Sequence, residues 1–364
     1  MDHQVSTNCS DSETNQTISG FENQNAFDQL LERIFLLDAP GLSWTIFLFG
    51  IVAIVGNILT ILVYARLGFA QTINMSYVAL AVSDLFSVLT AMTGAFCFTP
   101  AMGAILQQLR VRVDLANLAA FVGDWPHFAF SKTTAILTAW VSVERCLCVL
   151  IPTRVRLIIN RRVTKTVVSA LFVLGCCPLV FAYIGMKTDW EFDAETNTTT
   201  LNIFYSFKKA NNVYNSIAVL LYGAVYPTLS WVIVTTCTTF LIIKLRESAR
   251  WRKSNSNGVN PNVPTGTTQK NGHKGENRIT KTVVMIACVF ITCSLPRSVH
   301  SLVSLAFRHK YSTYGDLRPL FVMNAGFALL LSEINSGTNI ILYSITSRKF
   351  RSTLKEMVFN KFSK

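Results

Sequence analysis

Five polar side chains interrupt long apolar stretches of this sequence, and their types define the chemistry available to the chain. They are Asn57, Asp84, Arg145, Asn335 and Asn339. An ionisable side chain at membrane depth is costly, and it persists where it faces the interior of a helical bundle. An arginine there can form charge-assisted bonds that join two helices. These residues predict a polar core between helices, and no enzyme is expected, since no His, Asp and Glu cluster has metal-site spacing.

Seven long apolar runs must position these polar residues. Of the 364 residues, 51% are hydrophobic and only 15% are charged, whereas a soluble domain has about 25% charged residues. About 20 apolar residues cross a bilayer as a helix. The runs cover residues 43–66, 73–99, 118–149, 163–186, 213–245, 279–306 and 319–345. We therefore predict an all-α membrane protein, a bundle of seven transmembrane helices over residues 43–345.

The net charge of +13 is unevenly distributed along the chain. Basic residues gather after the third run, after the fifth run and in the last 19 residues, while residues 1–42 carry seven acidic side chains against Arg33 alone. Loops rich in Lys and Arg stay in the cytoplasm. We expect an extracellular N-terminus at 1–42, a partly flexible cytoplasmic loop at 246–278 and a cytoplasmic tail at 346–364. The chain would then be a multi-pass protein of the plasma membrane, and nucleic acid is not an expected partner.

The positions of sequons and cysteines predict which covalent modifications the extracellular face carries. Asn8, Asn15 and Asn197 each begin an N-glycosylation sequon on a segment that we expect outside the cell. Eight of the nine cysteines lie in or next to the apolar runs, and only Cys9 is clearly outside. We therefore expect no disulfide between the outer loops.

A charged pair closes the third apolar run. Arg145 can extend its side chain to the inner membrane surface, which is a purely structural role. It can also pair with the adjacent Glu144 and with Glu276, which precedes the sixth run. Two carboxylates around one guanidinium would form a latch between helices, and opening it would act as a switch.

Short motifs follow one another in the order of the runs. They are Gly56-Asn57, Leu80-Ala81-Val82-Ser83-Asp84, Glu144-Arg145-Cys146, Tyr226-Pro227, Phe290 to Pro296, Asn335 to Tyr343, and Phe350 within Ser347 to Arg351. In this order they resemble the rhodopsin-like G-protein-coupled receptors. The resemblance implies an extracellular small-molecule or peptide ligand, a heterotrimeric G protein inside, a short amphipathic C-terminal helix, and switch roles for Pro296 and Tyr343.

The chain departs from that family at several positions. Ser294 replaces a tryptophan and Ile340 replaces a proline. Both positions of the usual disulfide lack cysteine, since Ala120 stands near the first and residues 187–212 contain none. The runs at 123–127 and 144–152 look like those of molluscan chemosensory receptors.

The resemblance also suggests a ligand site and an ion site. His127 stands where amine receptors have an Asp, and Glu333 stands where opsins have the retinal-binding Lys. With Lys132, Arg297 and His300 they would bind an acidic or zwitterionic ligand; alternatively, Arg297 and Glu333 pair with each other. The polar core residues that would meet at mid-membrane are Asp84, Thr134, Asn335 and Asn339. They would hold a sodium ion, as often in the family, or only water, and no other cofactor is expected.

Apart from the enzyme excluded above, two functional classes are compared. A receptor fits the motif order, either as a chemosensory receptor for small molecules or as a neuropeptide receptor. A transporter is disfavoured because the chain has no internal repeat and no pair of broken helices.

Overall fold

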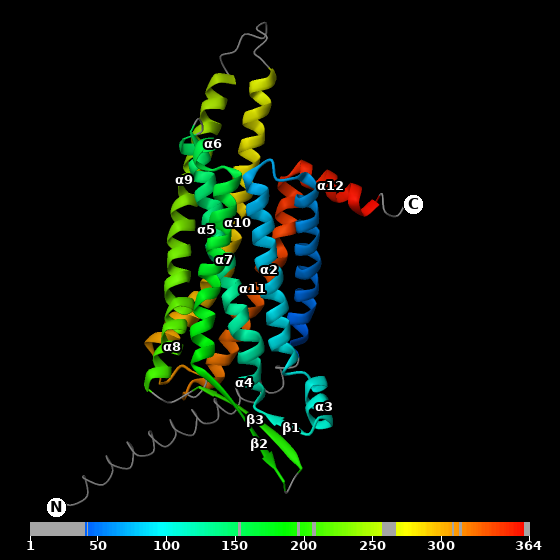
Figure 1. Cartoon of the computed structure of the whole chain (residues 1–364). Coiled ribbons are helices and arrows are strands. Elements are labelled where there is room, and N and C mark those ends of the chain that lie inside the picture. The colour runs from blue at the N-terminus through cyan, green and yellow to red at the C-terminus, as the bar shows by residue number, and fades with distance from the viewer. Residues whose placement is uncertain are drawn as a thin grey trace, which may run out of the picture.

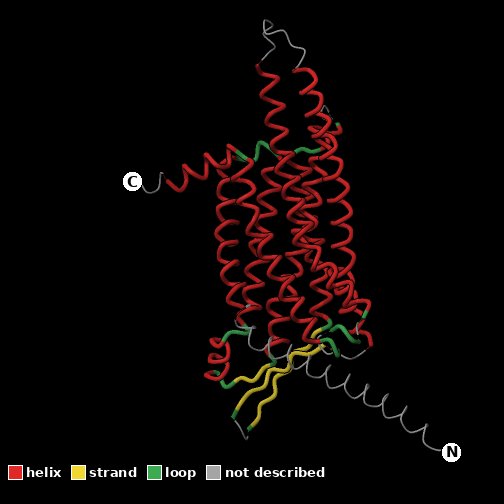
Figure 2. Tube along the Cα trace, turned by 180° about the vertical axis from the view of Figure 1, so that it is seen from behind, coloured by secondary structure: helices red, strands yellow, loops and turns green. Residues whose placement is uncertain are grey.

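The computed structural model describes residues 41, 43–151, 154–194, 197–205, 209–256, 267–307, 309–312 and 315–359. Seven helices in these residues are long and apolar enough to cross a membrane. They run side by side as one bundle (Figures 1 and 2). Their membrane-crossing parts cover Ser43–Leu67, Thr72–Phe96, Leu115–Leu150, Arg161–Ile184, Val213–Lys244, Thr282–Ala306 and Arg318–Thr346. The predicted seven-helix fold is confirmed, with boundaries within a few residues of those expected.

The first of these helices is Ser43–Leu67, and the remaining elements follow in chain order. They are α2 (Thr72–Phe96), α3 (Pro100–Gln108), β1 (Val111–Val113), α4 (Leu115–Ala119), the π-helix η1 (Ala120–Asp124), α5 (Trp125–Leu150), α6 (Val155–Ile158), α7 (Arg161–Ile184), β2 (Met186–Asp193), β3 (Thr198–Tyr205), α8 (Lys209–Leu220), the π-helix η2 (Leu221–Val225), α9 (Tyr226–Ser256), α10 (Thr267–Ala306), α11 (Arg318–Thr346) and α12 (Arg348–Phe359).

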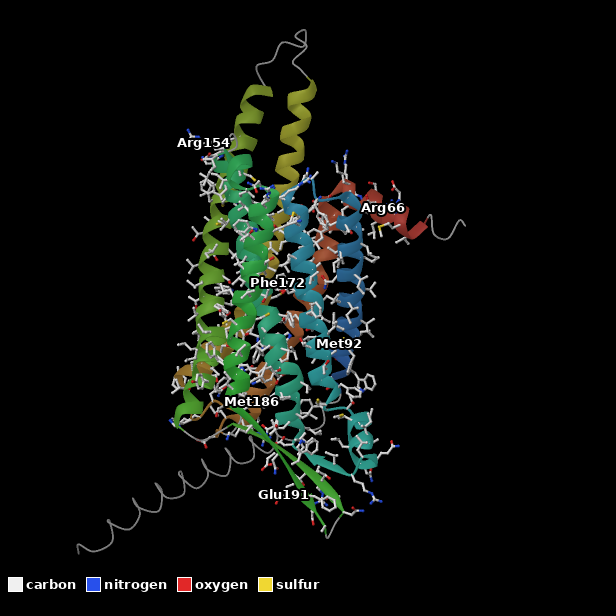
Figure 3. The ribbon with its side chains drawn as sticks, viewed as in Figure 1. Arg66, Met92, Arg154, Phe172, Met186 and Glu191 are labelled. Carbon is white, nitrogen blue, oxygen red and sulfur yellow. The ribbon has the colours of Figure 1, made fainter. Side chains whose placement is uncertain are left out.

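The two ends of the bundle differ. The strands and α3 lie at one end, here called the sheet end, and α12 leaves the bundle sideways at the other, here called the α12 end (Figure 1). Arg66 and Arg154 lie at the α12 end, whereas Glu191 lies at the sheet end (Figure 3). The predicted short C-terminal helix is therefore present as α12, and its Phe350 is fully buried against Tyr64 and Tyr343.

A three-stranded sheet caps the sheet end, which the sequence analysis did not predict. β2 and β3 form an antiparallel hairpin, and β1 pairs with β3 in parallel, with Val111 opposite Thr199. The backbone N–H of Thr199 also donates to the Arg110 carbonyl at 2.9 Å. The loop before the third span is thus tied to the loop after the fourth by hydrogen bonds. The described cysteines are all free; Cys9 lies outside the described residues, and the expected lack of a disulfide between the outer loops stays a prediction.

Each π-helix precedes a proline in a membrane-crossing helix. Pro126 follows η1 and Pro227 follows η2. A proline has no N–H and its ring clashes with the carbonyl four residues earlier. That carbonyl belongs to Val122 in the first case and to Gly223 in the second. A wider π turn removes the clash while keeping the helix continuous, and π turns are frequent at functional sites.

The segment between α9 and α10 needs a correction. Residues 246–278 were expected to be a loop, but α9 continues to Ser256 and α10 begins at Thr267. Both helices extend beyond the bundle at the α12 end (Figure 1). A helix that is already nucleated in the membrane gains one hydrogen bond for each residue it adds. Leu, Arg, Glu, Ala and Lys, all good helix formers, make up seven of the nine residues 245–253.

Candidate functional site

Asp84 anchors the polar core, as the sequence predicted. Its side chain is fully buried. One carboxylate oxygen accepts from Thr134 Oγ1 at 2.8 Å and the other accepts from Asn339 Nδ2 at 2.7 Å. The hydrogen bonds join α2, α5 and α11 in the middle of the bundle. Asn57 does not take part, because its Nδ2 donates to the Ala53 carbonyl within the first helix at 2.9 Å.

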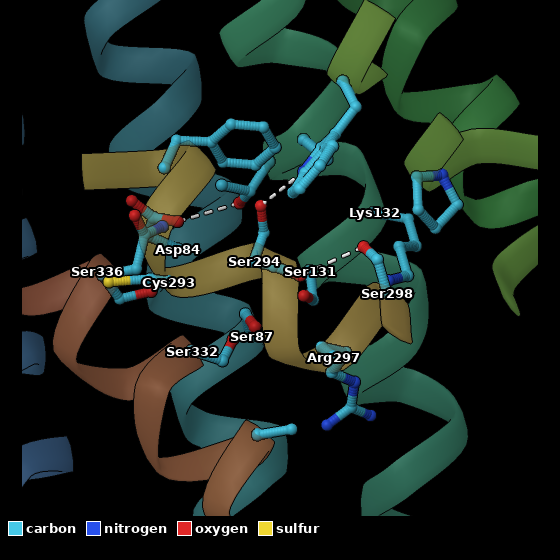
Figure 4. Close-up of a pocket in the computed structure, with 17 residues that line it drawn as sticks. Asp84, Ser87, Ser131, Lys132, Cys293, Ser294, Arg297, Ser298, Ser332 and Ser336 are labelled. Atoms are coloured by element: carbon cyan, nitrogen blue, oxygen red, sulfur yellow. Dashed lines mark hydrogen bonds between the residues drawn. The ribbon is translucent and has the colours of Figure 1, made fainter. Parts of the chain in front are cut away.

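A narrow cavity of about 40 Å³ extends from Asp84 between α5, α9, α10 and α11 (Figure 4). Two cationic side chains, Lys132 and Arg297, line it together with Asn335 and seven hydroxyl groups. The hydroxyl-bearing residues are Ser87, Ser131, Thr134, Ser294, Ser298, Ser332 and Ser336. Asp84 lies on the opposite side of the cavity from Lys132 (Figure 4). The cavity has room for a few water molecules or one compact polar group.

Neither cation has a carboxylate within 4.0 Å among the described residues, although Asp124 and Glu333 lie near enough for their charges to act on Arg297. In that part of the chain the ion pairs within 4.0 Å are Arg145 with Glu144 and Lys244 with Glu247. Arg297 instead lies over the ring of Phe128, with 4.6 Å from Cζ to the ring centroid. This contact stabilises the guanidinium by about 0.5–2 kcal/mol. The alternative in which Arg297 and Glu333 form a direct salt bridge is therefore not what the described residues show.

The other three residues of the expected ligand site lie around the cavity rather than in its wall. Glu333 is 1% exposed, and neither carboxylate oxygen has a hydrogen-bond partner among the described residues. His127 is buried with its Nδ1 3.1 Å from both Ser87 Oγ and the Ser87 carbonyl. His300 Nδ1 is 2.8 Å from the Tyr311 hydroxyl. Of the five residues of the expected ligand site, Lys132 and Arg297 are thus the two that line the cavity.

A tryptophan that the sequence analysis missed closes one side of the cavity. Trp231 on α9 donates from Nε1 to Ser294 Oγ on α10 at 2.8 Å, and both residues line the cavity. Ser294 is the position at which the resembled family has tryptophan. The signal that could have found this contact is the placement of Trp231 one turn after Pro227, facing the helix that lacks the bulky side chain.

Arg145 and Glu144 form the predicted pair at the α12 end. Arg145 Nη2 lies 3.2 Å from Glu144 Oε1, and Glu144 is fully buried. Glu144 also accepts from Thr72 Oγ1 at 2.6 Å and from Ser76 Oγ at 2.9 Å. These two hydrogen bonds join α5 to α2. The donors lie 72 and 68 residues from Glu144 in the sequence, so no local sequence pattern predicts the contacts. The side chain of Glu276, on α10, lies outside what the structure describes, and a latch to it stays a prediction.

Two further residues with an expected switch role lie on α10 and α11. Pro296 is inside α10, which continues through it. Tyr343 is 1% exposed, its ring centroid is 4.8 Å from that of Tyr77, and its hydroxyl has no hydrogen-bond partner among the described residues. With Ile340 in place of the family's proline, α11 runs unbroken from Arg318 to Thr346.

From the resemblance to G-protein-coupled receptors, we expect that replacing Glu144 by Gln raises ligand-free signalling several-fold. The substitution removes the charge that holds Arg145 in place, and breaking a buried pair by removing one partner costs about 3–5 kcal/mol. Ligand-free nucleotide exchange on added G protein measures the effect, with Glu247→Gln, at the exposed Lys244 pair, as the control. Equal basal exchange in wild type and Glu144→Gln would show that the pair does not restrain the resting state.

Comparison with known proteins places these features in a family. The family model described as 7 transmembrane receptor (rhodopsin family) matches residues 56–343, from Gly56 in the first helix to Tyr343. The chain belongs to the rhodopsin family of seven-transmembrane receptors. It is therefore a receptor rather than an enzyme, and a multi-pass protein of the plasma membrane.

Relatives of this receptor are distant and differ in ligand. It is 25% identical to the somatostatin receptor type 5 of Bos taurus over 317 residues, which are 83% of this chain and 72% of that protein. It is 24% identical to the adenosine receptor A2b of Homo sapiens over 323 residues, 84% of this chain and 86% of that protein. It is 23% identical to the allatostatin-A receptor of Bombyx mori over 325 residues, which are 85% of this chain and 77% of that protein.

Proposed function

We propose that this receptor binds a ligand with an acidic group from the extracellular side and activates a heterotrimeric G protein in the cytoplasm. The observation that carries the proposal is that Lys132 and Arg297 line one cavity without a carboxylate partner within 4.0 Å among the described residues. Burying an unpaired charge costs several kcal/mol. A carboxylate on the ligand would supply the missing partner through charge-assisted hydrogen bonds.

The dimensions of the site suit the acidic group of a ligand rather than a whole molecule, and a chemosensory molecule can carry such a group. The cavity of about 40 Å³ admits one compact group, and ligand pockets that enclose a whole molecule measure about 300–1,000 Å³. A neuropeptide is the second candidate, because some relatives are named for somatostatin and allatostatin-A. Its C-terminal carboxylate would then be the group that reaches Lys132 and Arg297.

The proposed orientation puts the sheet end outside the cell. Exposed basic side chains such as Arg66 and Arg154 lie at the α12 end, as the positive-inside rule requires of the cytoplasmic face (Figure 3). Asn197 is exposed in the turn between β2 and β3 at the sheet end, where its sequon can be glycosylated. The sequons of Asn8 and Asn15 lie outside the described residues, and their glycosylation stays a prediction.

The Asp84 cluster is proposed to bind sodium. The carboxylate of Asp84 and the hydroxyl oxygens of Thr134, Ser83 and Ser336 offer the oxygen atoms that such an ion prefers, and Asn335 lines the same cavity. Asn339 donates to Asp84 at 2.7 Å, so the ion competes with an existing hydrogen bond. The alternative is a water-filled network at the same residues.

Sodium should lower agonist affinity in the wild type and have no effect in Asp84→Asn. An ion that favours the resting state opposes the ligand through a reciprocal coupling, typically of about 1–3 kcal/mol. The measurement is agonist affinity in sodium chloride against the choline salt at equal ionic strength. A sodium response of equal size in Asp84→Asn would support the water network instead.

Nucleotide exchange on purified G proteins tests the proposed function directly. The receptor is reconstituted in nanodiscs with a panel of G proteins, and pools of carboxylates, amines and neutral molecules are compared. We expect exchange only with carboxylate-bearing pools, and none in Arg145→Ala. Stimulation by amines or neutral molecules alone would overturn the acidic-ligand proposal. Substrate flux into vesicles without exchange would favour a transporter.

A further inference from the structure

A second hollow lies on the outside of the bundle, between α9 and α10. Its volume is about 460 Å³, and we call it the α9–α10 groove. Its walls are largely apolar side chains that point away from the bundle, among them Val232, Leu295, Val299 and Leu302, which are 43–59% exposed. Both helices cross the membrane at this level, so the groove opens toward the lipid tails.

The groove and the central cavity share a wall. Pro227, Trp231 and Ser298 line both of them. The hydrogen bond from Trp231 Nε1 to Ser294 Oγ, 2.8 Å long, holds the indole across the boundary. On the cavity side Ser298 lies next to Lys132 (Figure 4). These three residues therefore separate the hydroxyl-lined cavity that holds Lys132 and Arg297 from an apolar groove in the membrane, and Trp231 has the largest side chain among them.

We propose that the ligand is an acidic amphiphile, a carboxylate with a long apolar chain, and that it spans both compartments. The inference rests on the proposed function and adds the ligand class. The carboxylate binds at Lys132 and Arg297, and the chain passes Trp231 into the α9–α10 groove. The volumes fit this division: the cavity of about 40 Å³ accepts the acidic group alone, while the open groove of about 460 Å³ accepts the chain.

Trp231 then acts as the gate between the two compartments. The chain cannot pass while the indole is held by Ser294, so binding breaks that hydrogen bond and separates α9 from α10 at this level. An extracellular amphiphile reaches the groove through the outer half of the bilayer, in which it dissolves with its apolar chain among the lipid tails. Ligand binding and helix displacement are thereby coupled through one side chain.

The test uses three probes that differ in head group and chain length. Butyrate has the carboxylate without the chain, laurate has both, and dodecanol has the chain without the charge. Nucleotide exchange is measured with the receptor in nanodiscs. We expect laurate to be more potent than butyrate and dodecanol to be inactive. Since partition into lipid alone favours long chains, potency must also be compared between receptor variants.

Two tryptophan substitutions on α9 provide that comparison. Val232 is 59% exposed and lines the groove, whereas Leu229 is 55% exposed and does not. Val232→Trp fills the groove and should reduce laurate potency about tenfold, which corresponds to 1.4 kcal/mol, with no change for butyrate. Leu229→Trp places the same side chain on the lipid-facing surface outside the groove and should leave the potency of both acids unchanged. Laurate carrying a terminal photoreactive diazirine should label groove residues in the wild type and not in Val232→Trp.

The outcomes separate this inference from the proposed function. Suppose that both acids act through Arg297, but that Val232→Trp and Leu229→Trp change the potency of laurate equally or not at all. The groove then does not hold the chain, while the proposal that the receptor binds acidic ligands is retained. If no acid of any length stimulates nucleotide exchange while other molecules do, the proposed function is wrong, and so is the inference that the ligand is an acidic amphiphile. Labelling confined to residues outside α9 and α10 would also contradict the proposal that the chain lies in the α9–α10 groove.

Discussion

Replacing Arg297 or Lys132 by Gln should reduce the potency of carboxylate agonists by about ten- to a hundredfold. A hydrogen bond to a charged group contributes about 1.5–3 kcal/mol, and each 1.4 kcal/mol is a tenfold change in affinity. Both side chains line the same narrow cavity, and neither has a carboxylate partner within 4.0 Å among the described residues. The ligand's own charge is therefore the partner whose loss the substitution measures.

The controls distinguish recognition from folding. A neutral amide of the same agonist should be weak on the wild type and should lose little further in either variant. Lys187→Gln neutralises an exposed lysine on β2 and should change nothing. Surface expression, measured in parallel, reports on folding. If acid and amide lose potency by the same factor, Arg297 acts through its contact with Phe128 and the packing of α10, and the acidic-ligand proposal is wrong.

The sequence predicts the parts of this receptor that depend on local composition. The membrane-crossing helices are readable because each needs about 20 apolar residues, and the observed boundaries differ from the expected ones by a few residues. The Asp84 cluster was also predictable, since a buried carboxylate requires donors and Thr134 and Asn339 lie on helices that the family motifs place nearby. The need of a buried carboxylate for donors, together with the expected placement of the helices, was enough to predict that site.

Contacts between distant segments could not be predicted in the same way. β1 is three residues long and pairs with a strand almost ninety positions later, with Val111 opposite Thr199, so no alternating pattern identifies it. Thr72 and Ser76 look like ordinary helix residues until the fold brings Glu144 to them. Trp231 compensates for Ser294 from another helix. In each case the partner is determined by helix packing, which single-sequence periodicity does not encode.

One consequence of that packing concerns the missing disulfide. At the sheet end, η1 and α2 meet backbone to backbone: a Cβ at Gly123 would lie 2.3 Å from Gly94 Cα and 2.6 Å from Gly94 N. The obstructing atoms belong to a helix backbone, which cannot move aside as a flexible side chain can. This contact and the β1–β3 pairing hold together the region that a disulfide secures in the resembled family. The close approach therefore makes Gly123 a structural requirement of the bundle.

Gly123→Ala should consequently lower the melting temperature of the purified receptor by several degrees. Overpacking a tight site costs about 1–3 kcal/mol or more, because α2 and η1 must separate to admit the methyl group. Gly94→Ala should have a smaller effect, since its Cβ would meet Gly123 Cα at 3.4 Å, which is ordinary contact. Gly103→Ala on α3 is the matched control, with nothing within 4 Å of the new Cβ. A thermal-shift assay in detergent should rank the losses in that order, and a Gly123→Ala receptor that melts with the wild type would mean that the two helices are not in direct backbone contact.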